Sequence, residues 1–155
     1  MATKRPTPEA LLRKVFPPML ATLADAPPAG PSWAFELKYD GFRAITAIAG
    51  GKLAMWSRNE LDLAPRFPKI AEQLAKVKLD DAVLDGEIVA IDAEGVPRFQ
   101  LLQGGTAREI FFAFDILWLD GRDLRKLLRG QTVSVIFRRE CGVDDPAWID
   151  AVDDD

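Results

Sequence analysis

The sequence predicts an α+β fold built on antiparallel strands. The pair Gly50-Gly51 separates two strand-like segments, residues 42–49 and 52–57, as in a two-residue hairpin whose turn residues take positive φ. A hairpin leaves no room for the crossover helix that a parallel sheet needs, and helical spacing is confined to short segments. The 155 residues, 48% of them apolar and 28% charged, suffice for one domain with a substantial core.

The first 32 residues are expected to form an irregular lead-in. Seven of the eleven prolines lie there, and each fixes φ and removes a backbone donor. A short helix is expected at residues 9–15. From Trp33 to Tyr39 the residues alternate with period two, which predicts a strand with Glu36 and Lys38 on one face.

Three further elements follow the hairpin. Residues 68–77 place apolar side chains at helical spacing, with a proline tolerated in the first turn. Residues 83–91 suggest a strand that is broken by Asp85-Gly86-Glu87. Residues 110–119 are strongly apolar and aromatic, which predicts a buried strand interrupted by one charge, Asp115.

The residue types present exclude most familiar catalytic arrangements. The sequence has no histidine and a single cysteine, Cys141, so Ser-His and Cys-His nucleophiles, an internal disulfide and a cysteine-based zinc site are all ruled out. The basic, proline-interrupted start has no secretory apolar region, and no run of 18 apolar residues occurs to span a membrane. A cytoplasmic protein without a membrane partner is therefore expected.

The net charge of −4 is unevenly distributed. From Glu140 onward the chain carries seven of its 24 acidic residues and no Lys or Arg. The remainder therefore has a slight excess of bases, which is compatible with a polyanionic partner. Charge alone favours the simpler interpretation, a mixed solvated surface with an acidic tail.

Lys38-Tyr39-Asp40-Gly41 places a lysine near a strand end, directly before turn-forming residues. A lysine amine is a nucleophile only when deprotonated, which requires burial or a cationic neighbour such as Arg43. Taken alone, the tetrapeptide favours a surface hairpin with a solvated lysine.

Three further motifs follow in order and change this interpretation. The four motifs are Lys38-Tyr39-Asp40-Gly41-Phe42-Arg43, Ser57-Arg58-Asn59, Leu84-Asp85-Gly86-Glu87 and Phe112-Ala113-Phe114-Asp115-Ile116-Leu117. Over about residues 16–126 the chain thereby resembles the nucleotidyltransferase (adenylation) domain of ATP-dependent DNA ligases, most closely the bacterial end-joining ligases of the ligase D type. The resemblance implies an antiparallel-sheet, ATP-grasp-like nucleotidyltransferase core.

The same resemblance implies the nucleotide chemistry. Lys38 would attack the α-phosphate of ATP and become lysyl-AMP, releasing pyrophosphate. Glu36 would contact the adenine edge, Phe114 would stack on the adenine ring, and Glu87 would serve the ribose and a Mg²⁺ or Mn²⁺ ion. An aromatic face beside a polar contact gives both affinity and base selectivity.

Two arginines complete the implied site. Arg43 and Arg58 would approach phosphates, including the 5′-phosphate of nicked or broken double-stranded DNA, because the planar guanidinium suits phosphate. Asp85 and Asp115 are interpreted as structural partners rather than catalysts. The implied role is nick or break sealing in DNA repair and recombination.

The chain also departs from the family. The two later motifs of the family, of which one supplies a metal-binding Glu and the other supplies lysines to the α-phosphate, are not found after Leu127, and neither is the OB-fold domain. The expected organisation is a lead-in at 1–32, an incomplete adenylation domain at 33–126 and an unrecognised acidic tail at 127–155. The chain is thus expected to be a truncated ligase that does not seal nicks alone.

Two other functions stay open. RNA ligases and mRNA-capping guanylyltransferases share the lysine motif, although Trp118-Leu119-Asp120-Gly121-Arg122 favours DNA ligase. A non-catalytic remnant that binds nucleic acid is the second alternative, and it would form no covalent nucleotide adduct.

Overall fold

The computed structural model describes residues 6–20, 22–23, 26, 33–37, 39–104, 108–126, 135–137 and 149–153. The chain divides into two compact units, one formed by Met1–Pro18 with Asp40–Arg125 and the other by Met19–Tyr39 with Lys126–Asp155. The three-part division at residues 32 and 126 stays a prediction.

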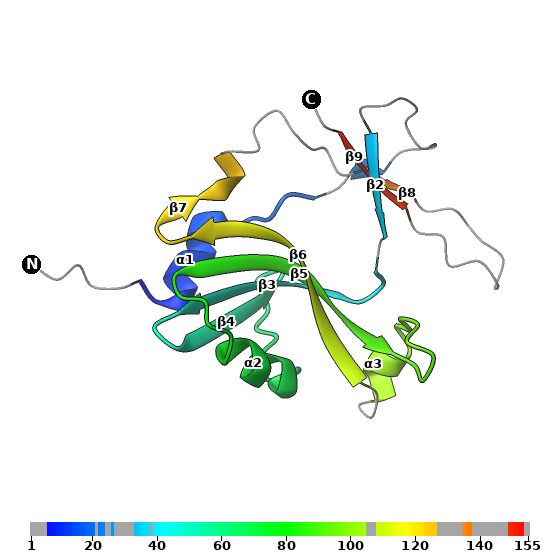
Figure 1. Cartoon of the computed structure of the whole chain (residues 1–155), viewed down its shortest axis with the longest axis horizontal. Coiled ribbons are helices and arrows are strands. Elements are labelled where there is room, and N and C mark those ends of the chain that lie inside the picture. The colour runs from blue at the N-terminus through cyan, green and yellow to red at the C-terminus, as the bar shows by residue number, and fades with distance from the viewer. Residues whose placement is uncertain are drawn as a thin grey trace, which may run out of the picture. The chain divides into compact units, whose positions relative to one another are not determined.

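The first unit contains a five-stranded antiparallel sheet, as the sequence predicts (Figure 1). The strand order is β4-β3-β5-β6-β7. The bounds are Phe42–Ala49 for β3, Lys52–Ser57 for β4, Ala82–Ile91 for β5, Arg108–Leu119 for β6 and Arg122–Asp123 for β7.

The hairpin prediction is confirmed in detail. Strands β3 and β4 have the predicted bounds, and Gly50 and Gly51 join them with φ of 58° and 71°. Both angles lie in the left-handed region, which glycine reaches without the steric cost that a Cβ brings.

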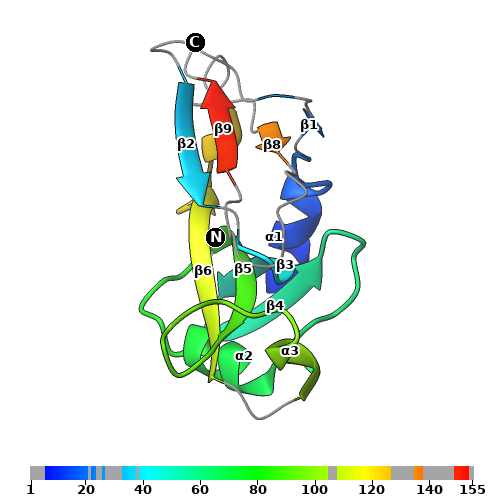
Figure 2. The same cartoon turned by 90° about the vertical axis from the view of Figure 1, so that its right-hand side faces the viewer.

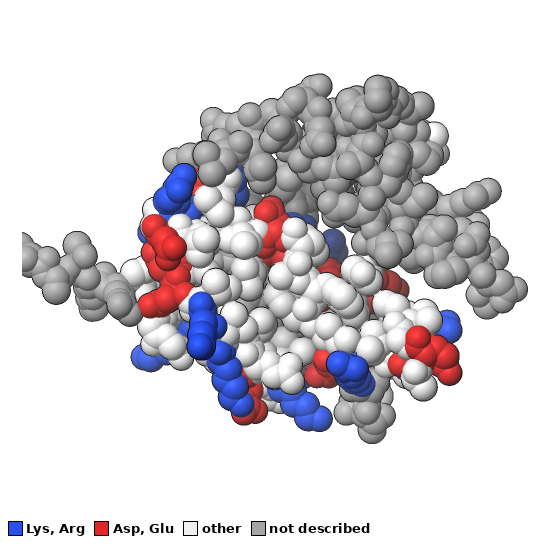
Figure 3. Space-filling view, viewed as in Figure 1, with Lys and Arg blue, Asp and Glu red and all other residues white. Residues whose placement is uncertain are grey.

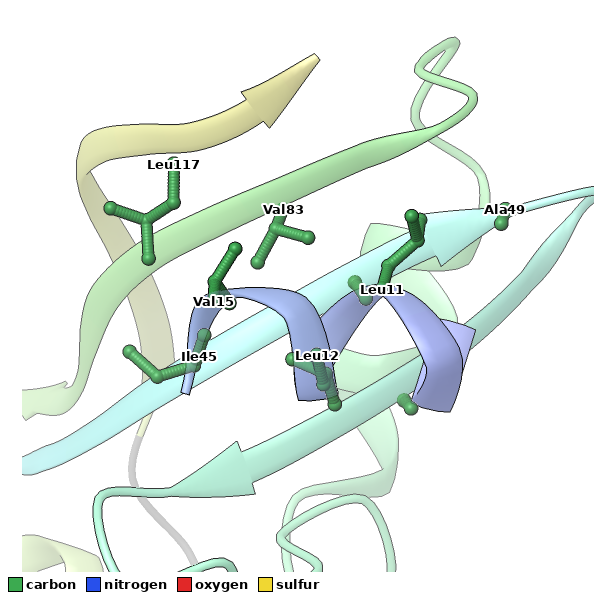
Figure 4. Close-up of a cluster of buried hydrophobic side chains, with 9 residues drawn as sticks. Leu11, Leu12, Val15, Ile45, Ala49, Val83 and Leu117 are labelled. Carbon is green, nitrogen blue, oxygen red and sulfur yellow. The ribbon is translucent and has the colours of Figure 1, made fainter. Parts of the chain in front are cut away.

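Short helices cover the sheet from both sides. Helix α1, Pro8–Val15, begins at Thr7, whose side chain accepts a hydrogen bond from Ala10 N. Its Leu11, Leu12 and Val15 pack on Ile45 and neighbouring residues of one sheet face (Figure 4). The lead-in of residues 1–32 therefore contributes the predicted helix to a hydrophobic core.

The opposite face is covered by α2, Pro68–Ala75, and α3, Leu101–Gly104, which Figure 2 shows at the same end of the sheet. The core of this face is built from these helices, the preceding loop and the sheet strands. Its buried residues include Met55, Phe67, Ile70, Leu74, Ile88 and Leu102. Helix α2 ends two residues before the predicted end, and a 3₁₀ turn, Leu124–Lys126, follows β7.

Two expectations about the central strands were wrong. Strand β5 is continuous through Asp85-Gly86-Glu87, because register shifts against β6, after Val83 and again after Asp85, absorb the irregularity. Strand β6 is not buried along its length, since Phe114 and Ile116 are 52% and 41% exposed. Among the described strands, β7 pairs with the outer side of β6 only at Trp118 and Leu119.

The second unit contains four short strands in the order β1-β8-β9-β2. They are Thr22–Leu23, Val135–Phe137, Ile149–Asp153 and Trp33–Leu37, respectively. The last is the strand predicted for residues 33–39, and it ends at Leu37. No helix in the described part of the chain is long and apolar enough to cross a membrane.

Candidate functional site

A row of motif side chains crosses the middle of the first unit's sheet. Arg43 on β3 lies opposite Glu87 on β5, and Glu87 lies opposite Phe112 on β6. Directly opposed residues point to one face. Arg43 and Ile45 are two residues apart on β3, so their side chains point to the same face of the sheet. Helix α1 packs on Ile45, and the row therefore lies on the face that α1 covers farther along the strand.

Arg43 forms a two-point ion pair with Asp85 of the next strand. Its Nη2 donates to Asp85 Oδ2 at 2.6 Å and its Nε to Oδ1 at 3.0 Å. The Asp85 side chain is 4% exposed and that of Arg43 is 23% exposed. A bidentate pair fixes the plane of the guanidinium as well as its position.

The surroundings of the pair shift both pKa values. Burial raises the pKa of Asp85, and the Arg43 guanidinium opposes this shift without cancelling it. Burial lowers the pKa of Arg43, but the hydrogen bond and charge of Asp85, followed by the charges of Glu87 and Asp115, outweigh it and leave that pKa raised. Arg43 thus stays cationic, and Asp85 is its structural partner.

Phe42, the neighbour of Arg43, points into the opposite core. Its ring stacks on Phe99 with centroids 5.6 Å apart and contacts Phe67 at 5.6 Å. The Arg66 guanidinium lies 4.1 Å from the Phe42 centroid. This aromatic group holds the start of β3, and nothing in the spacing along the sequence predicted it.

Two motif glycines allow close approaches that any other residue would block. A Cβ at Gly41 would overlap the carbonyl oxygen of Ile88, and a Cβ at Gly86 would overlap that of Phe112 and come within 2.5 Å of the Phe111 ring. Neither glycine takes a positive φ. Both are therefore required by packing on the neighbouring strand.

The other expected site residues lie at different places. Phe114 lies on β6 at a register shift, between Ala113, which pairs with Gly86 of β5, and Asp115, which pairs with Asp85. It is half exposed. Arg58 is exposed just after β4, in a turn in which Ser57 Oγ accepts hydrogen bonds from Asn59 N and Leu61 N.

Glu36 and Lys38 belong to the part of the chain assigned to the second unit. Glu36 pairs with Asp150 across β2 and β9. Lys38 lies outside the described residues, so its predicted face remains a prediction. The structure thus brings Arg43, Asp85 and Glu87 together on adjacent strands.

No ready-made metal site is present among the described residues, because no group of three Asp, Glu, His or Cys side chains converges. Basic and acidic side chains are interspersed on the surface drawn in Figure 3. Glu87 is the carboxylate that lies directly opposite Arg43 in this row of motif side chains. Mg²⁺ commonly binds through one or two carboxylates together with substrate phosphates, so Glu87 fits a metal that arrives with a nucleotide.

Comparison with known proteins assigns the fold and these motifs to a class. The family model for the ATP-dependent DNA ligase domain matches residues 18–140, and the chain belongs to this family. It is 39% identical over 127 residues to the multifunctional non-homologous end joining protein LigD of Pseudomonas aeruginosa, covering 79% of this chain and 14% of the relative. It is 43% identical over 112 residues to LigD of Mycolicibacterium smegmatis, covering 70% and 15%.

Solved structures agree with the relatives. The ligase domain of Mycobacterium tuberculosis LigD matches with a TM-score of 0.54 at 34% identity, over 71% of this chain and 42% of that one. A mycobacterial DNA ligase D in complex with ATP and MES matches with a TM-score of 0.53 at 35% identity and the same coverage. The antiparallel nucleotidyltransferase fold and the ligase D resemblance are thereby confirmed, and the chain spans about a seventh of these two relatives' length.

Proposed function

We propose that this chain supplies the front part of an adenylation site in which Lys38 attacks the α-phosphate of ATP. A Lys38–AMP phosphoramide bond forms and the bond to pyrophosphate breaks. The observation that carries the proposal is the Arg43–Asp85–Glu87 arrangement, which follows Lys38 in the chain of a DNA ligase family member.

The remaining site residues take the following roles in this proposal. Arg43, held in plane by Asp85, neutralises phosphate charge, because phosphoryl transfer depends mainly on positioning and charge stabilisation. Arg58, which is exposed, contacts DNA phosphate. Phe114, also exposed, offers its ring to adenine, and Glu36 contacts the adenine edge.

A divalent cation completes the proposal. When bound, Mg²⁺ or Mn²⁺ neutralises the phosphate oxygens and polarises the α-phosphate. Glu87 is the residue that would hold it, together with the ribose. The partner is nicked or broken double-stranded DNA, the process is end joining in repair and recombination, and the place is the cytoplasm.

The proposal is tested at Lys38 directly. Incubation with ATP and Mg²⁺ is expected to add one AMP to Lys38, measured by mass spectrometry of the peptides, and Lys38→Ala should abolish the adduct. The exposed Lys78 provides the matched control, and Lys78→Ala should leave the adduct unchanged. An AMP on another lysine would refute the assignment. A parallel incubation with GTP that gives a GMP adduct, while ATP gives none, would indicate a capping-type enzyme.

A further inference from the structure

Arg66 is held by stacking although it lies at the surface. Its guanidinium lies 4.1 Å from the centroid of Phe42 and 5.5 Å from that of Phe67. Phe42 is itself fixed by Phe99, with an interplanar angle of 29°. Attraction between a guanidinium and a ring contributes about 0.5–1 kcal/mol at exposed sites, which favours one orientation.

The backbone around Arg66 is equally constrained. Leu63 and Phe67, on either side, are 5% and 1% exposed. The amides of Arg66 and Phe67 both donate to the carbonyl of Leu63, at 3.1 and 3.0 Å, and Leu63 N donates to Met55 O on β4 at 2.8 Å. Little conformational freedom is therefore left for a ligand to remove on binding.

Arg66 also keeps its charge unpaired within the part of the chain that the structure describes. The ion pairs between described residues join Arg43 to Asp85, Lys76 to Glu72, Arg98 to Asp92 and Arg125 to Asp123. Arg66 is in none of them. A guanidinium that lies on a ring still has its in-plane N–H donors directed outward, where they suit two oxygens of an anion.

The location of Arg66 indicates which anion it meets. Phe42 begins β3 and Ser57, the last residue of β4, pairs with Ala44, so Arg58 and the stacked Arg66 lie at the end of the sheet where β3 begins and β4 ends. Arg43 lies at the same end and points to the opposite face. Contacts from exposed arginines to the DNA backbone set position without reading sequence.

We propose that Arg66 binds a phosphate of the DNA backbone and that its stacking on Phe42 pre-orients it for this contact. The inference rests on the proposed function, which supplies DNA as the partner. It adds a DNA-binding residue that lies outside the four ligase motifs.

The test is fluorescence anisotropy of a labelled nicked duplex, titrated with the chain from 50 to 200 mM salt. One lost phosphate contact reduces the salt slope by about 0.9 and, referred to 1 M salt, weakens binding roughly eightfold at 0.1 M. Arg66→Ala and Arg66→Gln should both show this loss. Arg66→Lys should show less, because it keeps the charge but not the planar stack.

Lys52→Ala is the matched control, since Lys52 is an exposed cation at the hairpin end of the same strand pair. It should leave affinity and slope near wild type, and thermal melting should show that every variant is folded. Equal losses in Lys52→Ala, or an unchanged slope in both Arg66→Ala and Arg66→Gln, would overturn the inference.

The controls also separate this inference from the proposed function. ATP affinity should be the same in Arg66→Ala and wild type. If Arg66→Ala lost affinity for ATP as well as for DNA, Arg66 would contact the nucleotide, which would overturn the inference. A wild-type chain that forms the Lys38 adduct but binds no duplex even at 50 mM salt would overturn the Arg66 contact and leave adenylation standing.

Discussion

Phe42 and Arg43 are neighbours in the chain, yet their side chains leave opposite faces of β3. Phe42 enters the core that α2 and α3 cover, and Arg43 pairs with Asp85 on the other face. One dipeptide thus anchors the strand and orients the cation.

At the residue scale, Phe114 and Phe111 are expected to separate nucleotide binding from stability. Phe114 is 52% exposed, whereas Phe111 packs against the core and over Gly86. Phe114→Ala should weaken ATP binding by about 1–3 kcal/mol, the scale of base–aromatic stacking. Phe111→Ala should instead lower the free energy of unfolding by roughly 3 kcal/mol.

Two measurements on both variants distinguish lost ATP binding from lost stability. Titration calorimetry gives the affinity for ATP, and urea unfolding gives the free energy of unfolding. Phe114→Ala should change the free energy of unfolding by less than about 1 kcal/mol, as exposed substitutions usually do. Similar losses of ATP affinity in the two variants would show that Phe114 is ordinary packing.

At the scale of elements, the sequence predicted correctly those helices and turns that depend only on residues close together in the chain. The Gly50-Gly51 hairpin and the helix at residues 9–15 were predictable because turn chemistry and short-range spacing determine them. The continuity of β5 was not predictable, because it depends on register shifts against β6, which lies about 27 residues farther along the chain. The aromatic residues of β6 likewise could not indicate which of its two faces is buried, because burial depends on parts of the chain that are distant in sequence.

Gly86 is the element-scale position with the clearest expected outcome. A methyl group there would overlap the carbonyl of Phe112 and the ring of Phe111, so Gly86→Ala should destabilise the fold by about 1–3 kcal/mol, the usual cost of overpacking. Urea unfolding measures the change.

Gly104→Ala is the matched control, because a Cβ at Gly104 meets no atom within 4 Å. This variant should be neutral or slightly stabilising, since alanine loses less backbone entropy than glycine on folding. If Gly86→Ala were as stable as Gly104→Ala, packing could not be the reason for a glycine in this motif.

At the scale of the whole molecule, the family was predictable from the sequence, whereas the geometry of the candidate site was not, and the roles of its residues stay predictions. The ordered motifs identified Lys38, Arg43, Arg58, Glu87 and Phe114 through resemblance to a family, and the family is confirmed. The Arg43–Asp85 pair and the Phe42 stack required the fold, because each joins residues more than 20 positions apart. Glu36 and Lys38 lie in the chain segment of the second unit, so their part in the site stays a prediction.

The whole-molecule prediction concerns ligation itself. The part of the chain that matches the M. tuberculosis ligase domain structure covers 42% of that structure, and we expect that the 155-residue chain alone will not seal nicked DNA. Sealing needs three transfers: AMP onto Lys38, AMP onto the 5′-phosphate, and displacement of AMP by the 3′-hydroxyl. Each builds negative charge, and loss of one preorganised donor typically costs about 2.7–4 kcal/mol, or 10²–10³ in rate.

Several such donors, the later lysines and the second Glu of the family, have no counterpart that we find in the sequence, and their losses combine non-additively to leave little rate. Weak ATP binding by Arg43, Glu87 and Phe114 is compatible with this outcome. The measurement is a nicked duplex incubated with the purified chain, ATP and Mg²⁺, and resolved on a denaturing gel. A sealed product that disappears in Lys38→Ala would contradict the prediction and would mean that residues 127–155 supply the missing charges.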